Sequence, residues 1–372
     1  MSATFGSGDP PHACAQCLRR GWLLASVSAL LDRFALDRGR FDALLALGDE
    51  QLIDAIGGRR RDALRAAYHA ALPGAGRDQA DADAICVHDA RHPVASGGKD
   101  AARVLYVAGG ATRLQALADA PVVALLGSSG ASDYGMEVAR GLARSLSACG
   151  VTVVSVLNGG VGDAAQAGAL DAGCGALALV GDGLQIALGG ACRALYPRIT
   201  KGGCVISELP PGAHGRRWGW LSCERIAVAL ASLAIVVEAE GSDADLAAAR
   251  LARERGTALA AVPGRVTSRL SRGAHELLRE GASLVSCAQD ALELLHVPGE
   301  ANAQARAAAR PRATLDPDLR AVLESVGTGA DTPDALVREC GQPLFSVLLA
   351  LSDLELRGLL RRGRGGRYVR SA

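Results

Sequence analysis

The sequence predicts an α/β protein built on a doubly wound parallel sheet, with a helical region before the sheet and a small domain of helices and a β-hairpin after it. Between residues 121 and 295, short apolar runs alternate with segments of helical periodicity. Each apolar run is unbroken, as in parallel strands that are buried on both faces. Glycine-rich turns follow these runs, as expected where such strands end near a ligand.

The composition is that of an ordinary globular protein. The chain has 372 residues, 49% of them hydrophobic, and a formal net charge of +1. This length allows two or three domains, and the balanced charge indicates no particular partner. No apolar stretch approaches the roughly 18 residues of a membrane helix, and no charged-then-apolar leader begins the chain. We therefore expect a cytoplasmic protein that does not contact a membrane.

Cysteines raise the question of a metal site. The chain has ten, which fits a reducing compartment in which thiols stay free. Cys14 and Cys17 form a C-x-x-C pair. Further ligands for a four-coordinate zinc ion could come from His12, Cys86, His88 and His92. A single C-x-x-C without a second pair is weak evidence for a metal. We therefore predict free thiols, no metal site and no cofactor.

Changes in composition divide the chain into three predicted domains. Residues 1 to 72 form a helical domain, because apolar residues recur at spacings of three and four from Trp22 onward. Small residues without apolar periodicity then form a linker. The sheet domain spans residues 84 to 298. An Ala/Arg-rich linker leads to the last domain, residues 313 to 372.

Strands and helices are expected to alternate through the sheet domain. Two short strands lead into it, at 85–87 and 104–107. Further strands are expected at 122–126, 151–155, 176–180, 204–207, 234–238 and 258–262. Helices are expected near 133–149, 163–173, 191–201, 222–231, 243–256 and 272–281. The turns after the strands should meet at one edge of the sheet, where ligands of such sheets bind.

The turn after the strand at 122–126 is the first candidate for a binding site. It consists of Gly127, Ser128, Ser129 and Gly130 and precedes a helix. A turn of small residues at the positive end of a helix is suited to bind an anion. This turn lacks both the spacing of a dinucleotide fingerprint and the lysine of a P-loop, so it predicts an anion site without specifying the ligand. A tight turn that binds nothing remains the alternative.

The last 60 residues show the pattern of a winged helix: two short helices, a longer one and a glycine-tipped hairpin. The hairpin carries Arg361, Arg362, Arg364, Arg367 and Arg370. A basic wing is typical of a nucleic-acid contact. A protein contact is the alternative use of the same fold.

In this order the motifs resemble those of the DNA-processing protein A family, also called DprA or Smf, from about residue 23 to residue 370. The motifs are Ile85-Cys86-Val87-His88-Asp89, Gly127-Ser128, Tyr134-Gly135, Ser207-Glu208-x-Pro210-x-Gly212 and Ala261-Val262-Pro263-Gly264. The resemblance implies a sterile-alpha-motif-like helical domain, a Rossmann-like domain that binds single-stranded DNA and forms a homodimer, and a terminal winged helix. It implies no catalytic centre. It also implies that the protein protects incoming DNA and loads a RecA-type recombinase during natural transformation.

The chain departs from the family pattern where cations would contact phosphate. Ser129 replaces an arginine, and Asn158-Gly159-Gly160 replaces a turn that contains arginine. Each lost contact weakens binding, so we expect binding to be weak at physiological salt. With the family in mind, DNA and phosphate contacts are predicted from Gly127, Ser128, Ser129, Gly159, Gly160, Lys201, Trp220, Arg225 and Arg272. Trp218, Arg193, Arg216 and Arg217 are further candidates.

Two alternatives to a DNA-binding protein remain. The lost cations favour a scaffold that keeps the fold but no longer binds DNA strongly. The turn from Asn158 to Gly162 resembles the first glycine-rich loop of nucleotide phosphoribohydrolases, which suggests an enzyme, but no second loop of that kind follows.

Overall fold

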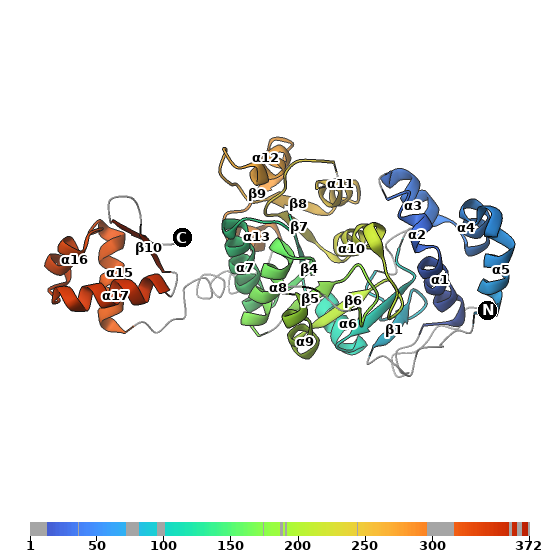
Figure 1. Ribbon diagram of the computed structural model, residues 1–372, viewed down its shortest axis with the longest axis horizontal. Coiled ribbons are helices and arrows are strands. Elements are labelled where there is room, and N and C mark those ends of the chain that lie inside the picture. Colours follow the sequence, from blue (N-terminus) through green and yellow to red (C-terminus); the bar gives the residue numbers. More distant parts are fainter. Residues whose placement is uncertain are drawn as a thin grey trace. The chain divides into compact units, whose positions relative to one another are not determined.

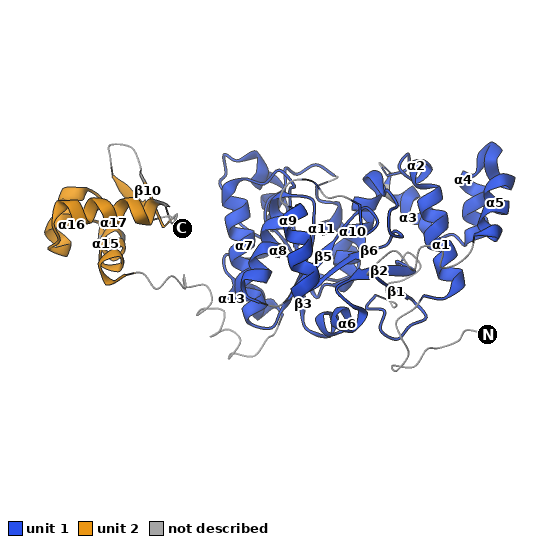
Figure 2. Ribbon diagram, turned by 60° about the horizontal axis from the view of Figure 1, so that its bottom comes forward, with its two compact units in different colours: residues 1–310 blue, residues 311–372 orange. Residues whose placement is uncertain are grey.

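The computed structural model describes residues 13–35, 37–71, 82–94, 101–173, 175–186, 189, 192–243, 245–295, 316–356, 359–362 and 367–370. The chain divides into two compact units, residues 1–310 and 311–372 (Figure 2).

A nine-stranded sheet forms the centre of the first unit, in the order β1-β2-β6-β5-β4-β3-β7-β8-β9 (Figure 1). The strands are β1 (Asp83–Cys86), β2 (Val104–Ala108), β3 (Val122–Leu126), β4 (Thr152–Val156), β5 (Ala176–Leu179), β6 (Cys204–Ser207), β7 (Leu233–Val236), β8 (Ala258–Ala261) and β9 (Ser283–Leu284). Neighbours from β6 to β9 are parallel. The two leading strands extend the sheet in antiparallel fashion, β2 beside β6 and β1 beside β2.

Helices cover both faces of the sheet, which confirms the predicted doubly wound architecture. They are α6 (Ala111–Asp119), α7 (Asp133–Ala148), α8 (Gly160–Asp171), α9 (Cys192–Gly202), α10 (Arg216–Leu230), α11 (Ala247–Glu254), α12 (Arg272–Arg279) and α13 (Ala288–Leu294). Side chains of β3 alternate between two cores. Val123 and Leu125 pack with α7, α8, α9 and α13, whereas Val122, Ala124 and Leu126 pack with α6, α10, α11 and α12.

The N-terminal helices pack against this sheet domain. They are α1 (Ala15–Ser26), α2 (Ser28–Leu31), α3 (Arg38–Ala46), α4 (Asp49–Ile56) and α5 (Arg61–Ala70). Their core includes Leu209 and Trp218 of the sheet domain. The Trp218 indole Nε1 donates to Ser28 Oγ at 2.9 Å, which ties α10 to α2. The predicted boundary between residues 72 and 84 therefore joins two parts of one compact unit.

The described residues of the second unit form three helices and a hairpin, as the winged-helix pattern predicts. These are α15 (Pro317–Thr328), α16 (Pro333–Cys340), α17 (Leu344–Leu356), and strands β10 (Leu360–Arg362) and β11 (Tyr368–Arg370), which pair antiparallel. The helices bury Val322, Leu336, Val347 and Leu351 against the hairpin residue Leu360. Arg364 of the predicted wing lies outside the described residues. No helix in the described parts of either unit is long and apolar enough to cross a membrane.

Candidate nucleic-acid interface

The turns after β3, β4 and β7 enclose a pocket at the carboxyl edge of the sheet, with a cavity volume of about 210 Å³. Gly127, Ser128 and Ser129 line it from the turn after β3, and Asn158 lines it from the turn after β4. Successive strands are added to opposite sides of β3, first β4 and later β7, so the pocket lies at the switch point where ligands bind in such sheets. The structure thus brings the two predicted glycine-rich turns together.

The glycines of the second turn allow the two turns to touch. Gly159 and Gly160 have φ angles of 98° and 53°, in the left-handed region that favours glycine. A Cβ atom on Gly160 would lie 2.2 Å from the Ser128 carbonyl oxygen. The Val161 N–H donates to that same oxygen at 3.1 Å. These glycines therefore shape the pocket wall through contacts within the protein.

Carboxylates of the protein itself occupy the helix starts at this edge. Glu238, which is buried, accepts hydrogen bonds from the Ser132 N–H at 2.8 Å and from Ser132 Oγ at 2.7 Å. Ser132 is the N-cap of α7 and accepts from the Gly135 N–H. An anion at a helix N-terminus is stabilised by the helix dipole. The Glu238 side chain is thus one anionic group at the start of α7, and the anion site in the turn from Gly127 to Gly130 stays a prediction.

Helix α8 begins in the same way. Asp163 accepts a hydrogen bond from the Gly159 N–H at 2.9 Å and another from the Cys192 thiol at 3.1 Å. Burial, with Asp163 beside it, raises the pKa of the Cys192 thiol to about 11, so the thiol stays protonated and can donate. The carboxylate therefore joins the starts of α8 and α9.

The charge of the pocket opposes phosphate. Glu224 and Asp245 line it, and none of its described lining residues is lysine or arginine. The described lining of the pocket therefore contains two carboxylates and no lysine or arginine. A phosphate placed here would meet negative charge, which raises its energy.

Arg225, predicted to bind phosphate, is placed inside the protein and does not line this pocket. Its side chain is buried, and Nη2 lies 2.5 Å from Oε2 of Glu208, which is also buried. Ser222 Oγ donates to the same carboxylate oxygen. The guanidinium charge is therefore compensated inside the protein, where it ties α10 to the turn after β6. Sequence reasoning missed this because the partners are 17 residues apart.

Lys201, also predicted to contact DNA, is not among the residues that line the pocket. It is in the last turn of α9, the helix that runs from the end of β5 to the start of β6. Because these two strands are parallel, the end of α9 lies at the amino edge of the sheet, opposite Ser128. Arg113 is nearby and donates to the Thr200 carbonyl.

The two tryptophans of α10 have different environments. Trp218 is fully buried in the core shared with the N-terminal helices, so it cannot stack on a base. Trp220 is 37% exposed and lies beside Gly181, the residue that follows Val180 after β5. A Cβ atom on Gly181 would lie 3.0 Å from the Trp220 ring. Trp220 is thus the tryptophan of α10 that presents a ring at the carboxyl edge.

Exposed arginines flank the acidic pocket on both sides. We define the β6-side patch as Arg193, Arg216 and Arg217, which lie in the first turns of α9 and α10. We define the β8-side patch as Arg265, Arg269 and Arg272, which follow β8. Arg269 also forms an ion pair with Glu240 at 3.2 Å. Of the predicted cations, Arg272 therefore lies at the expected edge.

The second unit presents a basic hairpin and an apolar helix face. Arg361, Arg367 and Arg370 are exposed, although Arg367 pairs with Asp331 at 2.8 Å. On α17, Leu344, Phe345, Leu348 and Leu349 are exposed, and Phe345 is 72% exposed. A winged helix places its third helix in the DNA groove when it reads bases. An apolar face on that helix is better suited to a protein contact.

Cys14, Cys17, Cys86 and His88 form a separate cluster of ligand groups on the first unit, with ligand atoms within 4.8 Å of one another. It involves no residue of the pocket.

Comparison with known proteins identifies related chains. The family model described as DNA recombination-mediator protein A matches residues 83–296, and that of the DprA winged helix domain matches residues 306–366. A Mycobacterium tuberculosis protein that carries the name DNA processing protein DprA is 38% identical over 249 residues, 66% of this chain and 63% of that protein. Protein Smf of Escherichia coli is 30% identical over 269 residues, 67% of each protein. This chain thus aligns with less than two thirds of the mycobacterial relative.

A solved structure supports the fold. The X-ray structure of DNA processing protein A from Streptococcus pneumoniae matches with a TM-score of 0.60 and 26% sequence identity. The match covers 76% of this chain and 98% of the pneumococcal chain.

Proposed function

The chain belongs to the DNA recombination-mediator protein A family, and on this basis we propose that it binds single-stranded DNA without catalysing a reaction on it. The proposal rests on the exposed arginines that lie along the carboxyl edge on both sides of the pocket. The partly exposed Trp220 is on α10, the helix that also carries Arg216 and Arg217 of the β6-side patch. The family is described by its role as a recombination mediator, which is not an enzymatic role.

The two arginine patches are so far apart that a single phosphate group cannot contact both. Only an extended stretch of single-stranded DNA could reach from one patch to the other. Five strand spacings separate β6 from β8, or about 24 Å at about 4.8 Å each. This exceeds the screening length of about 8 Å at physiological salt, so each patch acts on its own phosphates. Phosphates along a DNA strand are about 3.4 Å apart or more when the strand is extended, so about seven nucleotides or fewer would span the edge.

The pocket between the patches would then face bases or sugars rather than phosphates. Its carboxylates repel phosphate, whereas the exposed Trp220 ring can stack on a base, an interaction of about 1–3 kcal/mol. Binding of this kind depends strongly on salt and weakly on sequence. Because the described lining of the pocket contains no cation, we expect binding to be weak at physiological salt.

The finer functions of the family are part of the proposal. These are formation of a homodimer, loading of a RecA-type recombinase, protection of incoming DNA in natural transformation, and a cytoplasmic location. Membership of the family supports each of them. Light scattering at tens of micromolar tests the dimer, and a recombinase strand-exchange assay on DNA coated with single-strand-binding protein tests loading. A monomeric mass would contradict the homodimer. No stimulation of strand exchange would contradict recombinase loading.

Two alternatives compete with DNA binding. The acidic pocket and the apolar face of α17 favour a scaffold that contacts proteins. The phosphoribohydrolase gains less support, because the buried carboxylates Glu238 and Asp163 both cap helices at this edge.

Equilibrium binding to a labelled single-stranded oligonucleotide, beside the duplex of the same sequence, tests the proposed function. We expect the single strand to bind more tightly than the duplex at about 50 mM salt, with log affinity falling linearly with log salt. No binding of either DNA at this salt would support the scaffold instead. Release of free base from nucleoside monophosphates would support the hydrolase.

A further inference from the structure

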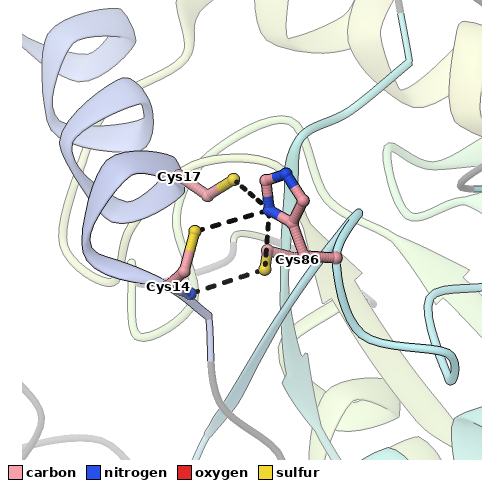
Figure 3. Close-up of side chains that lie close together, drawn as sticks. Cys14, Cys17 and Cys86 are labelled. Atoms are coloured by element: carbon pink, nitrogen blue, oxygen red, sulfur yellow. Dashed lines mark hydrogen bonds between the residues drawn. The ribbon is translucent and has the colours of Figure 1, made fainter. Parts of the chain in front are cut away.

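Four side chains with metal-binding atoms converge where α1 meets the edge of the sheet. Cys14 is the N-cap of α1 and Cys17 lies in its first turn, whereas Cys86 ends β1 and His88 follows two residues later. Figure 3 shows the Cys14, Cys17 and Cys86 thiols directed toward one point. The ligand atoms of all four residues lie within 4.8 Å of one another.

The distances in this cluster match a tetrahedral zinc site. His88 Nδ1 lies 3.4 Å from Cys14 Sγ, 3.5 Å from Cys17 Sγ and 3.8 Å from Cys86 Sγ. Zinc bonds of about 2.3 Å to sulfur and about 2.0–2.1 Å to nitrogen, set at the tetrahedral angle, place a sulfur and a nitrogen about 3.5 Å apart. The observed separations are centred on that value. None of the three cysteines is in a disulfide.

We propose that Cys14, Cys17, Cys86 and His88 bind one zinc ion. Three sulfur ligands and one imidazole nitrogen select zinc over magnesium or calcium, which prefer oxygen ligands. Four protein ligands complete the tetrahedral coordination and leave no open position for a water or substrate. The site is therefore structural rather than catalytic.

The surroundings of the cluster suit thiolate ligands. The backbone N–H of Cys14 donates to Cys86 Sγ at 3.4 Å, and such outer hydrogen bonds orient and stabilise metal-bound ligands. Two of the thiols lie at the N-terminus of α1, where the helix dipole favours negative charge. Cys17 and Cys86 are buried, whereas Cys14 and His88 are half-buried and leave a path for the ion.

A zinc ion here would fasten the N-terminal helices to the sheet. The ligands on α1 and those after β1 are 69 to 74 residues apart in sequence, and residues 72–81 between them lie outside the described chain. Strand β1 is an edge strand that pairs with β2 alone among the described strands. Metal binding contributes directly to folding when its ligands come from separate parts of the chain. The zinc site therefore stabilises the arrangement of α1 on the sheet, independently of DNA binding.

The second ligand pair explains why the sequence alone does not indicate this site. It is Cys86-x-His88, not a second C-x-x-C, and it follows about 70 residues later. Of the other candidate ligands, His92 is not part of the cluster, and His12 lies outside the described residues. The proposal replaces the expectation of free thiols at Cys14, Cys17 and Cys86.

Zinc content of the purified full chain, freed of any histidine tag and kept reduced, tests the proposal. We expect one zinc ion per chain by elemental mass spectrometry. Cys17→Ser and His88→Ala should lose the zinc, whereas the matched control Cys287→Ser, at an exposed cysteine outside the cluster, should keep it. Wild-type protein without zinc above the buffer blank would overturn the proposal, as would unchanged zinc in both ligand variants.

A second measurement on the wild-type chain does not depend on whether the variants fold. Removing the metal with a chelator should lower the melting temperature, and adding zinc should restore it. Cobalt added in place of zinc should give the intense visible absorption of tetrahedral cobalt together with a thiolate-to-metal charge-transfer band. No reversible shift in melting temperature, or octahedral cobalt spectra, would overturn the site.

Discussion

Replacing Arg225 with methionine distinguishes a core ion pair from a DNA contact. Arg225→Met leaves the buried Glu208 carboxylate without its cation. Breaking a buried ion pair by removing one partner costs about 3–5 kcal/mol. Ser222 still donates to the carboxylate, so we expect a loss near the lower end of this range.

The double variant Arg225→Met/Glu208→Met removes both charges and should recover most of the lost stability. Replacing a buried ion pair with apolar residues of similar volume is often neutral or stabilising by about 1–4 kcal/mol. The Ser222 hydroxyl then loses its acceptor, which costs about 1–3 kcal/mol. The double variant is therefore expected to be more stable than Arg225→Met, which is the sign of a direct interaction between the two residues.

Urea unfolding followed by tryptophan fluorescence measures these stabilities, and single-strand binding is measured on the same samples in the absence of urea. We expect Arg225→Met to unfold at a lower urea concentration and, while folded, to bind DNA as the wild type does. If Arg225→Met unfolds at the wild-type midpoint but binds DNA at least ten-fold more weakly, Arg225 is a phosphate ligand and its assignment to the core is wrong.

Three other changes test separate parts of the structure. Trp218→Ala should cost about 3–5 kcal/mol in urea unfolding, because it empties a buried site and removes a donor to Ser28; wild-type stability would show that this tryptophan is not core. Ser129→Arg should not tighten single-strand binding, because the pocket with Glu224 and Asp245 keeps a net negative charge; a gain of ten-fold or more would show that phosphate enters the pocket. Deleting residues 313–372 should leave one cooperative thermal transition, because the first unit has its own cores; loss of that transition would contradict the division.

Much of the fold could be predicted from the sequence, because the strands of a covered parallel sheet are unbroken apolar runs. Val122 to Leu126 is such a run, and every residue of β3 is buried. The antiparallel attachment of β1 and β2 could not be predicted in this way, since apolar runs do not specify their partners. The pairing depends on long-range register, which in the structure places Tyr106 opposite Ser207.

Less of the candidate site could be predicted, because burial and charge pairing depend on residues far apart in sequence. Arg225 looks like a surface cation until Glu208 is found beside it. Lys201 is a different case: the predicted helix and strand order already place the end of α9 at the amino edge, about 12 Å from Arg193 along the helix axis. The same topology places Arg193, in the first turn of α9, at the carboxyl edge.

The central claim is that arginines beside the pocket, and not Lys201, hold the single strand. The most direct test compares salt titrations of single-strand binding for wild type, the triple variant Arg193→Gln/Arg216→Gln/Arg217→Gln and the matched control Lys201→Gln. Each lost phosphate contact flattens the slope of log affinity against log salt by about 0.7 for single strands, so the triple variant should flatten it by about 2 and the control should leave it unchanged. An unchanged slope in the triple variant, with a slope flattened by about 0.7 in Lys201→Gln, would contradict the claim.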